Sequence, residues 1–335
     1  MKRRNFIRNV SYASLAYGGL HLAGCASDSS TSNKGTKNDK AAAQDSSEAL
    51  FFKLSLAQWS LNRAIREGGM NPLDFAEKAK KLGFGGLEYV NHLYSKSYLE
   101  APNMLQAIKG VGKDLLMRSK DNDIENLIIM IDGEGDLASS VEKGRKEGVE
   151  KHHKWVDLAN YLGCHSIRIN LLGEGTFENQ VEQATKSMRE LCEYAKPQNV
   201  NIIIENHGGN SSNPAFVAKV IEGSGMPNAG TLPDFGNFCI KREGGERWGA
   251  PCVEEYPDIY EGIQKMMPYA KGVSAKSYNF DAEGNETKID YYKMMKVVKD
   301  AGYKGYVGVE FEGEMDEEKG IIATRDLLIK AGKAV

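Results

Sequence analysis

The sequence predicts a closed barrel of eight parallel β-strands, each followed by a helix. Eight short runs rich in β-branched and other apolar residues alternate with segments of helical period, at a spacing of roughly 30 to 40 residues. An open doubly wound sheet would usually have fewer strands and a glycine-rich phosphate loop, and this chain has no GxGxxG or Walker sequence. We expect the strands at residues 52–58, 85–90, 126–132, 166–171, 200–205, 229–234, 272–276 and 305–311.

Helix start and stop signals lie between these runs. Asn71 and Pro72 begin one helical segment, and Thr176 begins another. Asp290 precedes DYYKMMKVVKDAG, whose apolar residues follow helical spacing up to Gly302. These signals support a helix after each strand, as the barrel requires.

The first 25 residues predict export. Residues 2–4 are basic, and the weakly apolar stretch from 7 to 23 is too short and too rich in Gly and Ser to span a bilayer. Arg3 and Arg4 with the following NFI resemble a twin-arginine signal, and LAGC ending at Cys25 resembles a bacterial lipobox. An ordinary signal peptide with a chance cysteine is the alternative. We expect a lipoprotein anchored in the periplasm or cell envelope through lipidated Cys25.

A tether and one large domain follow. Residues 26–49 are rich in Ser, Ala, Lys and Asp without apolar periodicity, which is typical of a disordered linker. Residues 50–335 are long enough for a single barrel domain. The formal net charge of −3 and the lack of a basic stripe argue against a nucleic-acid partner. The sequence leaves open whether the chain forms a homo-oligomer.

Four cysteines follow Cys25, and none forms a CxxC pair. A zinc ribbon and a thioredoxin motif therefore have no support. Cys239 and Cys252 flank a Gly-rich, charged loop. The two cysteines either form a disulfide that closes this loop in an oxidising compartment or remain free thiols. The surrounding segment 238–256 is long enough to be a lid or an interface.

Three of the apolar runs end in an acid: Glu205, Asp234 and Glu310. An ionised carboxylate at the end of a buried strand is costly unless a charge compensates it, so three in similar positions indicate one shared cation. Each acid alone would also fit a helix cap or a solvated strand end.

Barrel geometry places these acids together, because active sites lie at the carboxyl ends of the strands. Residues two apart on a strand face the same way. Further polar side chains are thereby expected at the same rim: His207 beside Glu205, Asn170 beside Arg168, and Lys276 beside Ser274.

Four motifs in order, IENHGG, PDFGN, VSAKSYNFD and GVEFEG, carry a family resemblance. They resemble the xylose-isomerase-like barrel superfamily of sugar phosphate isomerases and epimerases, over nearly all of the chain after the tether. The resemblance implies one divalent ion, often Mn, Mg, Co or Zn, held by Glu, Asp, His and Glu from strands five to eight. By matching position these are Glu205, Asp234, Ser274 and Glu310.

The departure from this pattern is Ser274, which stands where the family has a ligand His. Serine is a poor neutral ligand, so the site has one protein ligand fewer, recruits His207, or takes water or substrate there. We favour His207 as the fourth ligand, and the alternative is a histidine that orients substrate beside the metal.

The resemblance also implies a reaction. A metal-bound carbonyl favours removal of the neighbouring proton, giving an enediolate. Glu205 and Glu310 would remove and return this proton. Lys276 would stabilise the developing oxyanion or, alternatively, form an ion pair with one of the acids. The chemistry then gives an epimer or an aldose–ketose isomer.

Other strand-end residues are weaker candidates for the rim. Trp59 is predicted either to stack on a sugar or to pack in the core. Glu88 and Asp132 are predicted to line the site at the strand ends, to cap loops, or to pair with Arg168. The expected substrate-binding residues are Trp59, Glu88, Arg168, Asn170 and Asn237, with Glu312 as a further rim residue. We interpret His152 and His153, adjacent on a helix, as surface or packing residues.

Export points to an unphosphorylated sugar or glycoside, because sugar phosphates are mainly cytoplasmic. A lyase or hydrolase that cleaves 3-keto-glycosides by elimination is the alternative reaction. A non-catalytic carbohydrate-binding barrel is a third reading, although three retained acids argue against it. A DNA-cleaving nuclease would need several His ligands, and the chain has six His in all.

Overall fold

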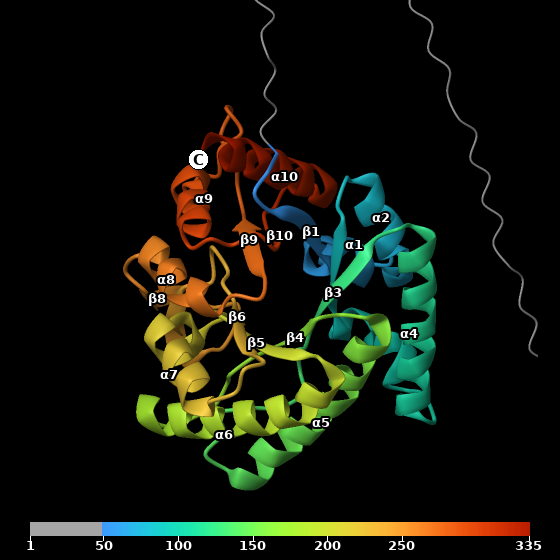
Figure 1. The fold of residues 1–335 in the computed structure, drawn as a ribbon, viewed down its shortest axis with the longest axis vertical. Helices are drawn as coiled ribbons and strands as arrows, with labels where there is room; N and C mark the ends of the chain where they lie inside the picture. The colour runs from blue at the N-terminus through green and yellow to red at the C-terminus, as the bar shows by residue number, and fades with distance from the viewer. Residues whose placement is uncertain (1–48) are drawn as a thin grey trace, which may run out of the picture. The chain divides into compact units, whose positions relative to one another are not determined.

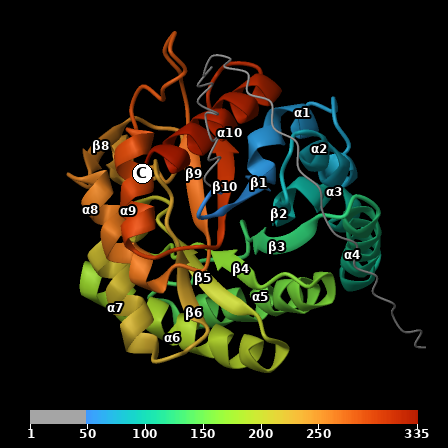
Figure 2. The same cartoon turned by 45° about the horizontal axis from the view of Figure 1, so that its top comes forward.

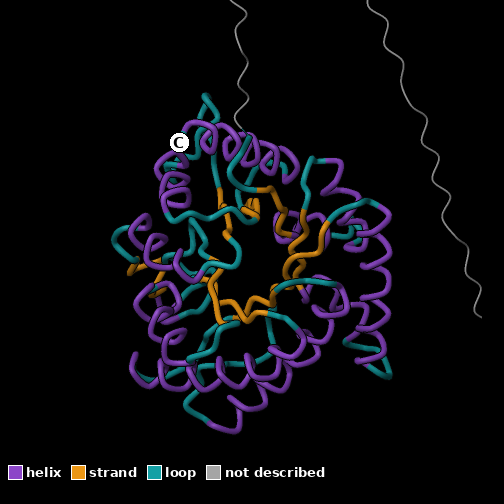
Figure 3. Tube along the Cα trace, in the orientation of Figure 1, coloured by secondary structure: helices purple, strands orange, loops and turns teal. Residues whose placement is uncertain are grey.

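Eight parallel strands form the predicted barrel. In a computed structural model that describes residues 49–335, Figure 3 shows these strands as a central ring surrounded by helices. All eight predicted strands are present, and their ends differ from the expected ends by at most two residues. They are β1 (Lys53–Ala57), β2 (Gly86–Val90), β3 (Glu125–Met130), β4 (Ser166–Ile169), β5 (Asn201–Glu205), β6 (Ala229–Leu232), β9 (Val273–Ser277) and β10 (Tyr306–Phe311).

Hydrogen bonds join the strands in the order β6-β5-β4-β3-β2-β1-β10-β9. Between β6 and β9 the ring is closed by two isolated parallel bridges, Thr231 with Ala270 and Asp234 with Ser274. Pro233 lacks a backbone N–H, yet its carbonyl accepts a hydrogen bond from Ser274 N at 2.9 Å. The strands are buried on both faces, which explains their nearly continuous apolar runs.

Helices follow the strands and cover the outside of the barrel (Figures 1 and 2). The predicted caps are confirmed: the Thr176 side chain accepts a hydrogen bond from Asn179 N, and Asp290 accepts from Tyr292 N and Lys293 N. The helices are α1 (Asn62–Arg66), α2 (Phe75–Lys81), α3 (Ser95–Tyr98), α4 (Met104–Asp121), α5 (Glu142–Leu162), α6 (Phe177–Ala195), α7 (Pro214–Ser224), α8 (Ile259–Met266), α9 (Tyr291–Asp300) and α10 (Glu317–Ala334).

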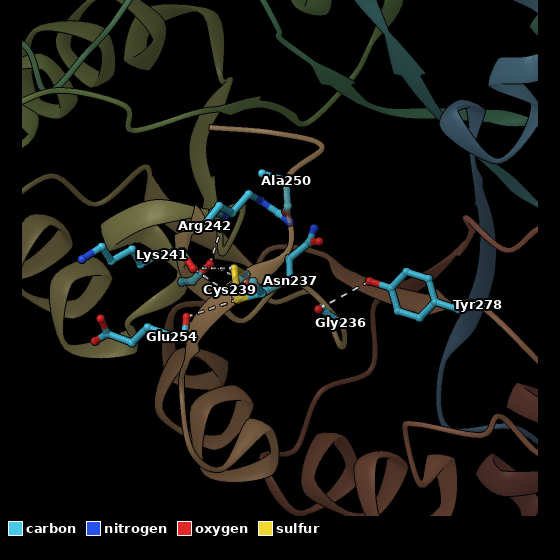
Figure 4. The surroundings of a disulfide bond; sticks show 11 residues. Gly236, Asn237, Cys239, Lys241, Arg242, Ala250, Glu254 and Tyr278 are labelled. Atoms are coloured by element: carbon cyan, nitrogen blue, oxygen red, sulfur yellow. Dashed lines mark hydrogen bonds between the residues drawn. A yellow bond between two sulfur atoms is a disulfide. The ribbon is translucent and has the colours of Figure 1, made fainter. Parts of the chain in front are cut away.

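The segment between β6 and α8 is a hairpin of two short antiparallel strands, β7 (Cys239–Arg242) and β8 (Cys252–Glu255). A disulfide joins Cys239 and Cys252 at its base. Of the two states that the sequence left open for these cysteines, the structure has the disulfide. Figure 4 shows Arg242 reaching across the hairpin to Ala250, whose carbonyl accepts a hydrogen bond at 2.8 Å.

The signal peptide, lipidated Cys25 and the tether predicted over 26–49 lie outside the described residues, except for residue 49. Their roles stay predictions. From residue 49 onward, every helix is too short or too polar to cross a bilayer.

Candidate functional site

The three strand-ending acids meet at the carboxyl end of the barrel. Glu205 ends β5, Asp234 follows β6, and Glu310 lies near the end of β10. All three side chains are buried, and one carboxylate oxygen from each lies within 4.8 Å of the others. Strand register explains this convergence, because Asp234 is paired with Ser274 and Glu310 with Lys276 on the intervening β9.

Ser274 and Lys276 of β9 contact two of these acids. The Ser274 hydroxyl lies 2.6 Å from Asp234 Oδ2 and 3.0 Å from Glu310 Oε2. Lys276 Nζ lies 3.2 Å from Glu310 Oε2 and 2.9 Å from Glu312 Oε1. Of the two roles predicted for Lys276, the ion pair with an acid is present. Its ammonium group lies within the cluster of acids.

Arg168 of β4 connects Glu205 to a second group of polar residues. Its Nε is 2.9 Å from Glu205 Oε2, and its Nη1 donates to Asp132 Oδ1 at 2.9 Å. Asn170 Nδ2 donates to the same Asp132 oxygen at 2.7 Å. The predicted pairing of Asp132 with Arg168 is present. Arg168 on β4 thus contacts one carboxylate on each side, Asp132 after β3 and Glu205 at the end of β5.

His207 lies outside the group of three acids. Its Nδ1 is 2.8 Å from Asn170 Oδ1, an oxygen that also accepts from Arg168 Nη1 at 3.0 Å. Nδ1 therefore carries the proton, and Nε2 is free to accept a hydrogen bond. Burial, with Arg168 nearby, lowers the pKa of His207 to about 4, so the ring is neutral at pH 7. Its role as a fourth metal ligand stays a prediction, and this geometry favours the orienting role.

Asn206 and Asn237 hold the acids in place. Asn206 Nδ2 donates to the Asp234 carbonyl at 2.8 Å, and its Oδ1 accepts from Asp234 N at 2.7 Å. Asn237 Nδ2 donates to Glu205 Oε1 at 3.1 Å, while the backbone N–H groups of Gly236 and Asn237 both donate to Asp234 Oδ1 at 2.9 Å. Asn206 was not among the residues predicted from the sequence, although it follows Glu205 directly in the IENHGG motif.

The site carries more negative than positive charge. Among residues 49–335, five carboxylates, on Asp132, Glu205, Asp234, Glu310 and Glu312, form ion pairs with two cations, those of Arg168 and Lys276. Burial, with Glu310 nearby, raises the pKa of Glu205 to about 7 despite Arg168. Burial also raises the pKa of Asp234 well above its usual range, despite Lys276. Burial alone would lower the pKa of Lys276, but Glu310, Glu312 and Asp234 raise it well above its usual value.

These residues fit a divalent cation. The charge surplus is what such an ion compensates, and oxygen donors suit hard or borderline ions such as Mg²⁺ and Mn²⁺. Glu205 Oε2 is buried without a hydrogen-bond partner, because its approach to Arg168 Nε does not have hydrogen-bond geometry. This orphaned oxygen belongs to the same group of three acids. The triad is therefore able to hold a metal ion.

A cavity of about 980 Å³ lies at this end of the barrel, and Glu310 of the triad lines it, whereas the more deeply buried Glu205 and Asp234 do not. Among the predicted substrate-binding residues, Trp59, Arg168, Asn170 and Asn237 line it, together with the rim candidates Asp132 and Glu312. Glu88 does not. It is buried inside the barrel, where Ser55 Oγ donates to its Oε1 at 2.6 Å, and burial raises its pKa to about 8.

Residues outside the barrel strands also border the cavity. Trp248, from the tip of the β7–β8 hairpin, lines it, and its ring lies 4.7 Å from the His207 ring. Tyr278 and His92 also border it. Of the two adjacent histidines, His152 is buried against the Gly148 carbonyl and His153 stacks on Tyr194, which agrees with packing roles, although His152 also borders the cavity.

Comparison with known proteins identifies relatives by profile and by fold. The sequence profile of the family described as xylose isomerase-like TIM barrel matches residues 76–331. The structure is similar to the 3-keto-D-glucoside 4-epimerase of E. coli, with a TM-score of 0.60, 11% identity, and coverage of 83% of this chain and 98% of that one. No match was found among curated protein sequences.

Two further solved structures have similar folds. The D-psicose 3-epimerase of Clostridium cellulolyticum has a TM-score of 0.57 and 16% identity, and the comparison covers 84% of this chain and 96% of that one. The D-allulose 3-epimerase of a Methylomonas species has a TM-score of 0.61 and 12% identity, with 84% and 99% covered. At these identities the similarity establishes the fold.

Proposed function

Because the chain belongs to the xylose isomerase-like TIM-barrel family, we propose that it is a metal-dependent sugar isomerase or epimerase. The observation that carries the proposal is the buried triad of Glu205, Asp234 and Glu310, whose oxygens converge within 4.8 Å in a structure with surplus negative charge. Three solved structures with this fold support the choice of reaction, because they are named as epimerases of a 3-keto-D-glucoside, D-psicose and D-allulose.

The triad would hold one divalent ion, and Mn, Mg, Co and Zn are the candidates. Bound there, the ion would polarise a substrate carbonyl and make the neighbouring C–H more acidic. Glu205 belongs to β5 and Glu310 to β10, and in this proposal one of them would remove the proton and the other would return it. Return to the opposite face of the same carbon gives an epimer, and return to the adjacent carbon gives an aldose–ketose isomer.

The surrounding residues orient the substrate and the acids. Arg168 and Asn237 fix the Glu205 carboxylate, and Asn206 fixes the backbone at Asp234. His207 Nε2 is available to accept a hydrogen bond from a sugar hydroxyl, because its Nδ1–H is directed to Asn170. Lys276 lies beside Glu310 and, in this proposal, would stabilise negative charge on the substrate oxygen.

We further propose an unphosphorylated sugar or glycoside as the substrate, and export of the protein to the bacterial cell envelope with an acyl anchor on Cys25. The sequence signals of residues 1–25 support export. The Cys239–Cys252 disulfide supports it independently, because disulfides persist in oxidising compartments. Sugar phosphates are mainly cytoplasmic, and this makes an unphosphorylated substrate the better candidate.

Two measurements test the function. The first is metal analysis of the purified protein and of Glu205→Gln, with Glu125→Gln as a control on an exposed glutamate at the opposite end of the barrel. We expect close to one divalent ion per chain in the wild type and the control, and clear loss in Glu205→Gln. A wild-type protein that binds no divalent ion after reconstitution would refute the metal site.

The second measurement follows solvent deuterium into free ketoses and 3-keto-glycosides. Exchange without bond cleavage identifies an isomerase or epimerase, and Glu205→Gln should lower it about 100- to 10,000-fold. Release of the aglycone would identify the alternative, a lyase that acts by elimination after the same proton removal. Absence of both reactions with every keto-sugar, in a metal-loaded protein, would instead favour the carbohydrate-binding barrel.

A further inference from the structure

The cavity is larger than one sugar ring requires. Its volume of about 980 Å³ lies at the upper end of the range of about 300–1,000 Å³ found for pockets of drug-sized ligands. A hexose has only about a dozen non-hydrogen atoms and is smaller than the drug-sized ligands that such pockets enclose. If the reacting carbons lie over the triad, much of the cavity remains for another part of the substrate.

The β7–β8 hairpin forms one wall of that remaining space. Cys239, Arg242 and Cys252 of the hairpin line the cavity. The hairpin is held by the Cys239–Cys252 disulfide and by hydrogen bonds from Glu243 N to the Pro251 carbonyl and from Arg242 to the Ala250 carbonyl (Figure 4). The wall is therefore a cross-linked element.

The tip of the hairpin is fastened to the other side of the cavity mouth. Arg247 donates from Nη1 and Nη2 to the two carboxylate oxygens of Asp136, at 2.9 and 2.5 Å. Asp136 lies between β3 and α5, so this two-pronged pair links loops that follow different barrel strands. The pair holds the residue that directly precedes Trp248.

Trp248 is an aromatic surface beside the reacting site. Its ring lies 4.7 Å from that of His207, and 45% of the residue is exposed. A Cβ at Gly208 would come within 3.3 Å of the Trp248 ring, and Gly208 has a φ of +81°, so glycine allows this close approach. One side of the indole thus packs on the base of the site, while the rest borders the cavity.

We propose that the substrate is a glycoside whose second ring, a sugar or an aromatic aglycone, packs on Trp248. The inference rests on the proposed function and specifies its substrate class. The reacting sugar lies beside Glu310, the acid of the triad that lines the cavity. The second ring then lies under the hairpin, where an indole offers a large apolar face with a polar edge. Trp248 is accordingly a specificity-determining residue, and it takes no part in the proton transfer.

The test compares matched substrates. The rate constant kcat/KM for deuterium exchange is measured with methyl and phenyl 3-keto-glucosides, which differ in the aglycone; exchange is used because aglycone release would favour the phenyl compound through its better leaving group alone. We expect the phenyl compound to be favoured about tenfold or more in the wild type, the size of one good aromatic contact. Trp248→Ala should bring the phenyl-to-methyl ratio close to one, and Trp248→Phe should restore most of it.

A control on the same hairpin separates packing from recognition. Val253 of β8 is 59% exposed and does not line the cavity, so Val253→Ala should retain the wild-type ratio. The double variant Cys239→Ala/Cys252→Ala should lower the ratio, because the hairpin that positions Trp248 loses its cross-link. A ratio near one in the wild type, or a ratio that Trp248→Ala leaves unchanged, would overturn the proposal.

A binding measurement distinguishes failure of this inference from failure of the proposed function. Unreactive methyl and phenyl β-glucosides are titrated into the full chain, and their dissociation constants are compared by calorimetry. Tighter binding of the phenyl compound, abolished by Trp248→Ala, supports the second-ring site even if no keto-sugar reacts. Equal binding of both compounds in the wild type overturns it, whatever the metal content or the exchange rate.

Discussion

Replacing Glu88 by glutamine tests whether the carboxyl group buried inside the barrel is protonated in the folded protein. Ser55 Oγ donates to Glu88 Oε1 at 2.6 Å, and Oε2 has no hydrogen-bond partner. Burial first, and then the charges of Glu310 and Glu205, raise the pKa of Glu88 from its usual 4.5 to about 8. The ionised form of this side chain is therefore unfavourable in the barrel.

The sign of the effect follows from linkage. Because the pKa is higher in the folded than in the unfolded chain, the folded state binds the proton more tightly between pH 4.5 and about 8. The stability that this proton contributes is fully present below pH 4.5 and is lost as the pH rises through about 8. At about 1.4 kcal/mol per pH unit, the loss is on the order of several kcal/mol over this window.

Glutamine cannot ionise, so Glu88→Gln removes this pH dependence. Its amide leaves one polar group without a partner, and that cost of about 1–3 kcal/mol is the same at every pH. The free energy of unfolding is measured by urea denaturation from pH 5 to 8.5 in EDTA, because a bound cation would shift the pKa. We expect wild-type stability to fall relative to the variant by about 2–5 kcal/mol over this range.

The matched control is Glu150→Gln, which removes an exposed carboxylate of α5. Its stability should follow the wild-type curve at every pH. If the Glu88→Gln curve ran parallel to the wild-type curve, Glu88 would titrate alike in the folded and unfolded chain. The account of Glu88 as a neutral buried acid would then be wrong.

Three other changes have defined outcomes. Lys276→Met leaves Asp234 and Glu310 without their cation, so the metal-free protein should lose about 3–5 kcal/mol in urea denaturation, with partial recovery on adding Mn²⁺; no loss would contradict the pairing. Gly308→Ala places a methyl group against the Glu88 carboxyl group, and calorimetry should show a lower melting temperature from about 1–3 kcal/mol of overpacking. Removing the Cys239–Cys252 disulfide, which spans 13 residues, should lower the free energy of unfolding by up to about 3 kcal/mol if the hairpin unfolds with the barrel. An unchanged midpoint in urea would mean that the hairpin unfolds separately.

The sequence was sufficient for the barrel because strand and helix periods are local properties. Runs such as VNIIIE and GYVGVEF are apolar throughout, as expected of strands buried on both faces, and Thr176 and Asp290 mark helix starts by short-range hydrogen bonds. The convergence of the three acids also followed, because a parallel barrel brings the carboxyl ends of all its strands to one rim.

The contacts within that rim depended on register. The Ser274 hydroxyl contacts two acids, and Lys276 pairs with Glu310 and Glu312. Glu88, in contrast, does not line the cavity. These positions follow from the hydrogen-bonded alignment of the strands. The sequence showed only that these residues share a face with their neighbours two positions away. It could not tell which of them reach the cavity and which remain in the barrel interior.

The sequence by itself therefore determined the barrel and the acids at its carboxyl end; that Ser274 replaces a ligand histidine stays a prediction from the family resemblance. Tertiary structure decided that the segment around Trp248 is a cross-linked hairpin over the site, held to Asp136 by Arg247 across 111 residues of chain. The physical reason is range. Periodicity and capping act between neighbours, whereas the size of a cavity and the partner of a buried charge depend on residues that only the folded chain brings together.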